Sequence, residues 1–110
     1  VVSPTDHNHT VRVSGNSMNN AKPVPIENGD YVLVKEQNKA EDHDIVVASL
    51  NDPSPRATVK RLRLSANRRI QLRPESLDPG IQNDPAYERE YIKEEVQING
   101  VVEAVFKKKQ

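Results

Sequence analysis

Cysteine is absent from this chain of 110 residues, and net charge and long apolar runs are absent with it. Without cysteine there is no disulfide framework of the kind that stabilises small secreted domains. Sixteen basic and sixteen acidic side chains cancel, so no overall charge attracts a nucleic-acid backbone. No apolar run approaches the length of a membrane span, and no signal peptide opens the sequence. A cytoplasmic protein is predicted, with no membrane contact and no direct DNA binding.

The residues that are plentiful favour strands. Fourteen valines and six isoleucines stand against six leucines, and branching at Cβ fits a pleated sheet but costs rotamer freedom in a helix. The length suits a single core, which must be aliphatic because only four aromatic residues are present: Tyr31, Tyr87, Tyr91 and Phe106. We predict one compact, mostly β domain with strands at 10–13, 31–35, 45–50, 57–64, 69–72 and 96–106.

These strands define a domain at residues 10–106, after a loose polar lead-in at 1–9 and before a basic tail at 107–110. Turns are expected at Asn28-Gly29 and at Asn51-Asp52-Pro53. A brief helical turn is expected to start at Ser17.

The stretch 74–91 contains Pro79-Gly80 and Asp84-Pro85, which interrupt regular structure. An enlarged surface loop is therefore predicted there, with one helical turn within 86–91. The arginines at 61, 63, 68 and 69 and the lysines of the tail are expected to form solvated surface.

No metal or cofactor is expected. Asp6-His7-Asn8-His9 offers imidazole and carboxylate groups, which are sound metal ligands. However, these histidines lie in the polar lead-in, and the only other histidine is His43.

The candidate chemistry lies in two separate segments. Ser17 follows Gly15 directly after the first predicted strand, and Lys60 lies within the strand 57–64. A serine hydroxyl becomes a nucleophile only when a base takes its proton, and a neutral lysine amine can be that base. Taken alone, Gly15 before Ser17 is also typical of an ordinary turn.

Strand alternation places Lys60 with Thr58 and Leu62 on one face, and both arginines of the strand on the other. The arginine face is the better candidate for solvent, so Lys60 is expected in apolar surroundings, where desolvation lowers its pKa from about 10.4. Thr58 would orient the amine. The alternative is that Lys60 extends along its methylene groups to reach water.

Six blocks in order resemble the LexA/UmuD family of self-cleaving peptidase domains: VRVSGNSM (11–18), IENGDYVLV (26–34), DIVVA (44–48), TVKRL (58–62), LRPES (72–76) and INGVV (98–102). The resemblance implies the LexA/signal-peptidase-like fold of short strands. Type I signal peptidases are similar in chemistry and core fold, but they need membrane-anchoring segments that are not visible here.

The resemblance also implies the roles of individual residues. Ser17 matches the family's nucleophile, Lys60 its general base and Thr58 the hydroxyl beside that lysine. The backbone N–H groups of Asn16 and Ser17 match the oxyanion hole, whose donors stabilise the charge that develops on an attacked carbonyl oxygen.

By the same resemblance, the chain is expected to be the autopeptidase domain of an SOS-type or prophage repressor, a homodimer stimulated by the RecA–single-stranded-DNA filament. Its substrate would be its own upstream segment. Family members cut at a small-residue-Gly bond upstream of the serine, and no Ala-Gly or Cys-Gly pair is present. A piece of a longer repressor, or a processed fragment, is therefore expected. Two alternatives stay open: a dimerisation module that does not cleave, and a UmuD-like polymerase accessory fragment.

Overall fold

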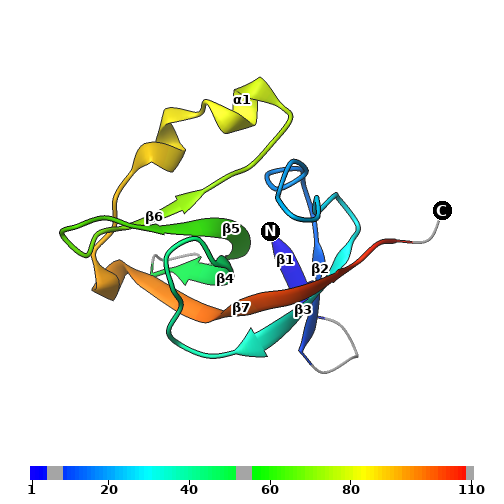
Figure 1. Cartoon of the computed structure of the whole chain (residues 1–110), viewed down its shortest axis with the longest axis horizontal. Coiled ribbons are helices and arrows are strands. Elements are labelled where there is room, and N and C mark those ends of the chain that lie inside the picture. Colours follow the sequence, from blue (N-terminus) through cyan, green and yellow to red (C-terminus); the bar gives the residue numbers. More distant parts are fainter. Residues whose placement is uncertain (5–8, 52–55, 109–110) are drawn as a thin grey trace.

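The computed structural model describes residues 1–4, 9–51 and 56–108 of the chain. Within them, an antiparallel sheet has the strand order β1-β2-β3-β7-β4-β5-β6 (Figure 1). The strands are β1 (Val2–Pro4), β2 (Thr10–Val13), β3 (Tyr31–Glu36), β4 (Ile45–Leu50), β5 (Ala57–Leu64), β6 (Ile70–Arg73) and β7 (Val96–Phe106). The prediction of one mostly β domain is confirmed. No helix in these residues is long and apolar enough to cross a membrane.

The six predicted strands are present, with β3 and β6 ending one residue later than expected. The prediction of a loose lead-in was wrong for its first residues, because β1 pairs with β2 and places Val2 opposite Val13. Three residues that include Pro4 are too short to show the alternation typical of a strand. The turn predicted at 51–53 lies mostly outside the described residues.

The brief helical turn expected from Ser17 takes the form of a hydrogen-bonded turn, and no helix is formed there. Met18 forms an isolated bridge with Ile26, and the N–H of Ala21 donates to the carbonyl of Met18. The chain therefore makes a tight turn whose buried anchor is Met18, which is 1% exposed. Gly15 starts this turn with a φ of 93°, which glycine adopts at little cost because it has no Cβ.

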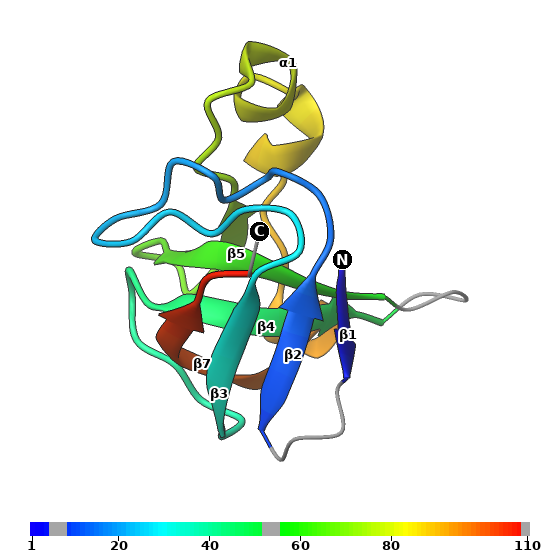
Figure 2. The ribbon, with the colours of Figure 1, turned by 90° about the vertical axis from the view of Figure 1, so that its right-hand side faces the viewer.

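The sheet curls on itself, so β1 lies against β5 although the two are far apart in the strand order. Figure 2 shows β1, β2 and β3 crossing β4 and β5. The long strand β7 joins the two halves and changes register against both β3 and β4. Gly100 permits close packing there, because a Cβ at this position would lie 2.6 Å from the carbonyl oxygen of Lys35.

The curl creates a core on each face of β5. Val59 belongs to a cluster with Val2, Val13 and Met18, whereas Leu62 belongs to a second cluster with Val46, Ile70, Leu72 and Val96. The expectation that the face opposite Lys60 meets solvent was therefore wrong at Val59, which is 1% exposed. The curled half of the sheet and the turn at Met18 cover that face.

The enlarged loop at 74–91 contains two short helices, α1 (Pro79–Gln82) and η1 (Pro85–Glu88), and η2 (Lys93–Glu95) follows it. Asp78 and Asp84 cap α1 and η1 by accepting hydrogen bonds from the N–H groups of Gly80 and Ala86. Both helices lie at one end of the molecule (Figures 1 and 2). The prolines that interrupt longer structure thus occupy the first turns of short helices, where proline is tolerated.

The start of the basic tail is bound to the domain. Asp30, a buried carboxylate, accepts hydrogen bonds from Lys107 Nζ and from the N–H groups of Glu27 and Lys108. Burial alone would raise the pKa of Asp30, but these hydrogen bonds, first that of Lys107, lower it. This cluster connects the end of β7 to the turn at Asn28-Gly29, where the predicted turn is confirmed.

We expect Asp30→Asn to lower the free energy of unfolding by about 2 kcal/mol, because the amide offers one acceptor where three donors converge. Denaturant titration measures the change. Glu27→Gln is the matched control, since Glu27 contacts the same Lys107 but is 57% exposed, and it should cost less than about 1 kcal/mol. Equal effects of the two substitutions would contradict a structural role for the buried carboxylate.

Candidate active site

The turn that carries Ser17 is tied to the turn that precedes β3. The N–H of Gly15 donates to Asn28 Oδ1 at 2.8 Å, and the N–H of Asn28 donates to Asn16 Oδ1 at 3.4 Å. Met18 lies directly after Ser17 and is buried in the first core. One side of the serine is therefore fixed by side-chain hydrogen bonds and by apolar packing.

The segment after β6 fixes the other side. The N–H of Glu75 donates to the carbonyl of Ser17 at 2.8 Å, and the carbonyl of Glu75 accepts from the N–H of Asn20 at 2.8 Å. Ser76 is buried and its Oγ donates to the carbonyl of Asn16 at 2.8 Å. Residues distant in sequence thus pair with the main chain on both sides of Ser17.

Arg61 fastens this segment to β5. Its guanidinium donates to Glu75 Oε1 at 2.9 Å, to the carbonyl of Lys22 at 2.7 Å and to the carbonyl of His43 at 2.8 Å. The Arg61 side chain is only 17% exposed, so the prediction of a solvated arginine was wrong at this position. Sequence alternation identified its face of the strand but not the three loops that converge on it.

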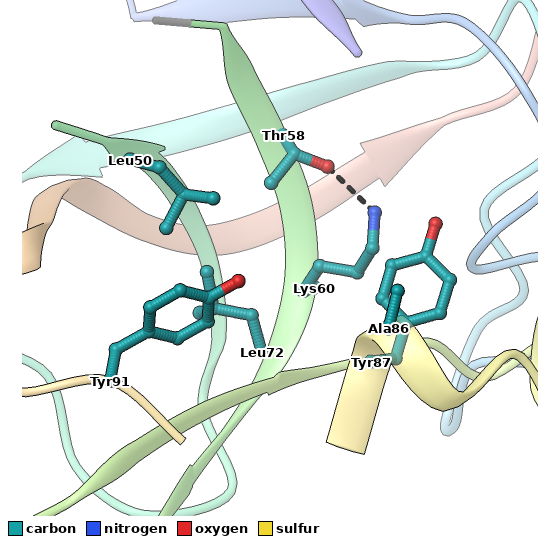
Figure 3. A pocket seen from close by; sticks show the side chains of 7 residues that line it. All are labelled: Leu50, Thr58, Lys60, Leu72, Ala86, Tyr87 and Tyr91. Carbon is teal, nitrogen blue, oxygen red and sulfur yellow. Dashed lines mark hydrogen bonds between the residues drawn. The ribbon is translucent and has the colours of Figure 1, made fainter. Parts of the chain in front are cut away.

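Lys60 lies on β5 beside Ser17. Its Nζ donates to Ser17 Oγ at 2.9 Å and to Thr58 Oγ1 at 2.6 Å, and the contact with Thr58 is drawn in Figure 3. The residue is 5% exposed, so the alternative in which Lys60 reaches water is wrong. Burial lowers the pKa of Lys60 to about 8, because a desolvated ammonium is less stable than the neutral amine.

The walls around Lys60 include residues that the sequence did not point to. Tyr87 places its ring centroid 5.5 Å from Lys60 Nζ, and Figure 3 shows the ring beside the lysine. Tyr87 belongs to η1, in the stretch where the sequence predicted only a surface loop. The one feature of the sequence that could have drawn attention to Tyr87 is that aromatic residues are scarce in this chain.

The N–H groups of Asn16 and Ser17 donate to no other group among the residues that the structure describes. Both residues reach the surface at the turn. The structure thus brings together Ser17, Lys60 and Thr58, with two backbone donors next to the serine. Of the histidine segment, residues 6–8 lie outside the described ranges, and His9 approaches Glu36 at 3.4 Å on the far end of β2 and β3.

The chain matches the Peptidase S24-like family over residues 1–103. It is 40% identical over 103 residues to the LexA repressor of Clostridioides difficile (strain 630), and this match covers 92% of this chain and 42% of that protein. It is 42% identical over 86 residues to the LexA repressor of Geobacillus sp. (strain WCH70), and the matched residues are 76% of this chain and 39% of that protein. The chain therefore belongs to the Peptidase S24-like family, as the resemblance predicted, and spans about two fifths of the length of these relatives.

The burial of Lys60 predicts a pH-dependent stability. At neutral pH we expect Lys60→Met to raise the free energy of unfolding by about 1–3 kcal/mol, because the parent must bury or neutralise an amine. Above the folded-state pKa of about 8, the unfolded chain binds one more proton than the folded one until about pH 10.4. The free energy of unfolding of the parent therefore rises with pH over that range. The difference between the parent and Lys60→Met shrinks accordingly.

Denaturant titration at several pH values measures this difference. Lys35→Met is the control, because Lys35 lies on the surface of β3 and its substitution should show no such pH trend. A constant difference between the parent and Lys60→Met across this range would mean that Lys60 stays charged in the folded protein.

Proposed function

We propose that this Peptidase S24-like chain is the serine–lysine autopeptidase domain of a LexA-like, cytoplasmic transcriptional repressor, with Ser17 as nucleophile and Lys60 as general base. One observation carries the proposal: Ser17 Oγ lies 2.9 Å from a buried amine. The low pKa of that amine supports it, because about 8 leaves an appreciable fraction neutral near physiological pH. A dimerisation module that does not cleave would not need this contact.

The chemistry follows from these positions. Neutral Lys60 accepts the hydroxyl proton as Ser17 Oγ bonds to the carbonyl carbon of the substrate peptide. The carbonyl oxygen becomes an oxyanion, for which the N–H groups of Asn16 and Ser17 are the available donors. Lys60 then returns the proton to the amide nitrogen, the C–N bond breaks, and an acyl-serine remains. A water molecule, deprotonated by Lys60, hydrolyses this ester.

Thr58 supports the base. Its Oγ1 lies 2.6 Å from Lys60 Nζ, so the hydroxyl restricts the rotation of the amine and keeps Nζ in reach of Ser17. Orientation of this kind avoids an entropic cost at the moment of attack.

The substrate is proposed to be a segment upstream of this domain. The N–H of Ser14 donates to the carbonyl of Val1 at 2.8 Å, so a segment joined to β1 would start next to the turn that carries Ser17. Such tethering raises the effective concentration of the scissile bond. In the intact repressor, stimulation by a RecA–single-stranded-DNA filament would start this cleavage.

Dimerisation is proposed to use the end of β7. Phe106 and Tyr31 are cross-strand neighbours and remain 51% and 38% exposed. Exposed apolar residues that lie together are common at interfaces between subunits.

The lysine base predicts the pH dependence of cleavage. For a peptide supplied in trans, we expect the rate to rise with pH through about 8, because protonation of Lys60 removes the base. Lys60→Arg should abolish this rise, since arginine keeps its charge at every pH of the experiment. Ser17→Ala should lower the rate by at least about a thousandfold.

Cleavage rates come from the appearance of the two product peptides. Lys35→Arg makes the same chemical change at an exposed lysine and should leave the profile unaltered. An alkaline rise that persists in Lys60→Arg would exclude Lys60 as the base, and full activity in Ser17→Ala would exclude Ser17 as the nucleophile.

For dimerisation, Phe106→Glu should weaken self-association by on the order of tenfold or more, because two-fold symmetry would place two new charges in one apolar contact. Sedimentation equilibrium of the parent and the variant measures this. Leu77→Glu is the control, since Leu77 is 69% exposed and belongs to the stretch 74–91 rather than to β7. A parent that stays monomeric at tens of micromolar would overturn the proposal.

A further inference from the structure

Three polar or charged residues are buried in the part of the chain that the structure describes: Asp30, Lys60 and Ser76. Asp30 binds the start of the basic tail, and Lys60 contacts Ser17. The hydroxyl of Ser76 meets the main chain of the turn that carries Ser17. A buried hydroxyl costs free energy unless it is hydrogen-bonded, so the direction of its hydrogen bonds indicates what the residue does.

The neighbours of Ser76 leave one main acceptor for its proton. Ser76 Oγ accepts from the N–H of Asp78 at 3.1 Å, and a hydroxyl has a single proton to donate. The carbonyl of Asn16, at 2.8 Å, is at the usual distance for such a donor. Asn19 Oδ1 is farther away, at 3.3 Å, and accepts from the N–H of Leu77 at 2.8 Å. The Ser76 hydroxyl therefore donates to the carbonyl of Asn16.

This hydrogen bond sets the direction of the N–H of Ser17. The carbonyl of Asn16 and the N–H of Ser17 belong to one planar, trans peptide group. The C=O and N–H bonds of a trans peptide point in opposite directions, so a carbonyl held toward Ser76 keeps the N–H pointing away from it. The next peptide group is fixed as well, because the carbonyl of Ser17 accepts from the N–H of Glu75 at 2.8 Å.

We propose that Ser76 is a positioning residue of the serine–lysine site, whose hydroxyl holds the Asn16–Ser17 peptide group so that the N–H of Ser17 faces the oxyanion. The proposal rests on the peptidase function proposed above and adds a residue that acts through the main chain. A donor that is already oriented needs no reorganisation when negative charge develops on the carbonyl oxygen, and it therefore stabilises the transition state.

The backbone of Ser76 is held independently of its hydroxyl. Its N–H donates to Gln82 Oε1 at 2.7 Å, and Gln82 is the last residue of α1. On the other side, Glu75 pairs with the turn through two backbone hydrogen bonds of 2.8 Å, and Arg61 binds its side chain. Removal of the hydroxyl should therefore leave the segment attached to the turn and free one peptide group to rotate.

The test compares Ser76→Ala with the parent on two ester substrates. One is the methyl ester of a capped peptide that ends in alanine, and the other has C=S in place of the reacting C=O. Sulfur is a weak hydrogen-bond acceptor, so the thionoester gains little from an N–H donor. Ser76→Ala should lower kcat for the oxygen ester by on the order of tenfold, because the oxyanion forms only in the transition state. KM and the rate on the thionoester should change little.

Two further substitutions at the same position sharpen this comparison. Ser76→Thr keeps the hydroxyl and should restore the parent ratio of the two rates. Ser76→Cys fills the same space with a weak donor, and it should behave like Ser76→Ala if the alanine variant does not fold. Thermal melting shows which variants are folded. Ser65→Ala is the matched control and should leave both rates unchanged, because Ser65 Oγ also bonds the main chain, at the N–H of Arg69, but in the turn between β5 and β6.

A folded Ser76→Ala that hydrolyses both esters like the parent, or that slows both equally, would overturn the positioning role and leave the peptidase function standing. Binding to Ser17→Ala, which keeps the N–H of residue 17, separates the two proposals. Calorimetry should show that this variant prefers the same peptide as a free acid over its amide, and adding Ser76→Ala should reduce this preference by about tenfold. If the parent hydrolyses neither ester, the peptidase function fails and this preference decides: its reduction supports Ser76, and an equal preference in both folded proteins overturns the proposal.

Discussion

The burial of a single amine determines how the rest of the structure is arranged around the site. Lys60 lies on β5, a strand with a core on each face, and desolvation lowers the pKa of the lysine to about 8. An amine in such surroundings is costly unless hydroxyl groups accept its hydrogen bonds, and Ser17 and Thr58 do so. The same desolvation that weakens the fold at neutral pH favours the neutral amine, which is the form that the proposed general base requires.

That arrangement depends on the turn at Ser17 being held in place from several directions. Asn28 accepts a hydrogen bond from the N–H of Gly15. Glu75 and Ser76 donate hydrogen bonds to main-chain carbonyls of the turn itself. Arg61, the neighbour of Lys60 on β5, anchors Glu75. Because consecutive residues of a strand point to opposite faces, one two-residue segment supplies both the buried amine and the cation that fastens the serine turn to the sheet.

Much of the fold was readable because its signals are local. Runs that contain valine, isoleucine or leucine at regular intervals predicted the strands β2 to β7, and alternation placed Lys60 on the same face as Thr58 and Leu62. The strand β1 was missed because three residues are too short to show a pattern. Arg61 and Val59 were assigned to solvent because nothing in their local sequence reveals that the sheet curls over them.

The sequence by itself determined the family and most of the strand content, and it pointed to Ser17, Lys60 and Thr58 as the proposed site, because ordered motifs and strand periodicity are properties of neighbouring residues. Only the tertiary structure decided that the lysine is buried, since its exposure depends on a sheet that curls until β1 lies against β5 and on a helical segment brought in after β6. The same folding places the Tyr87 ring beside Lys60. Burial and such contacts arise from packing between segments distant in sequence, and no local pattern encodes them.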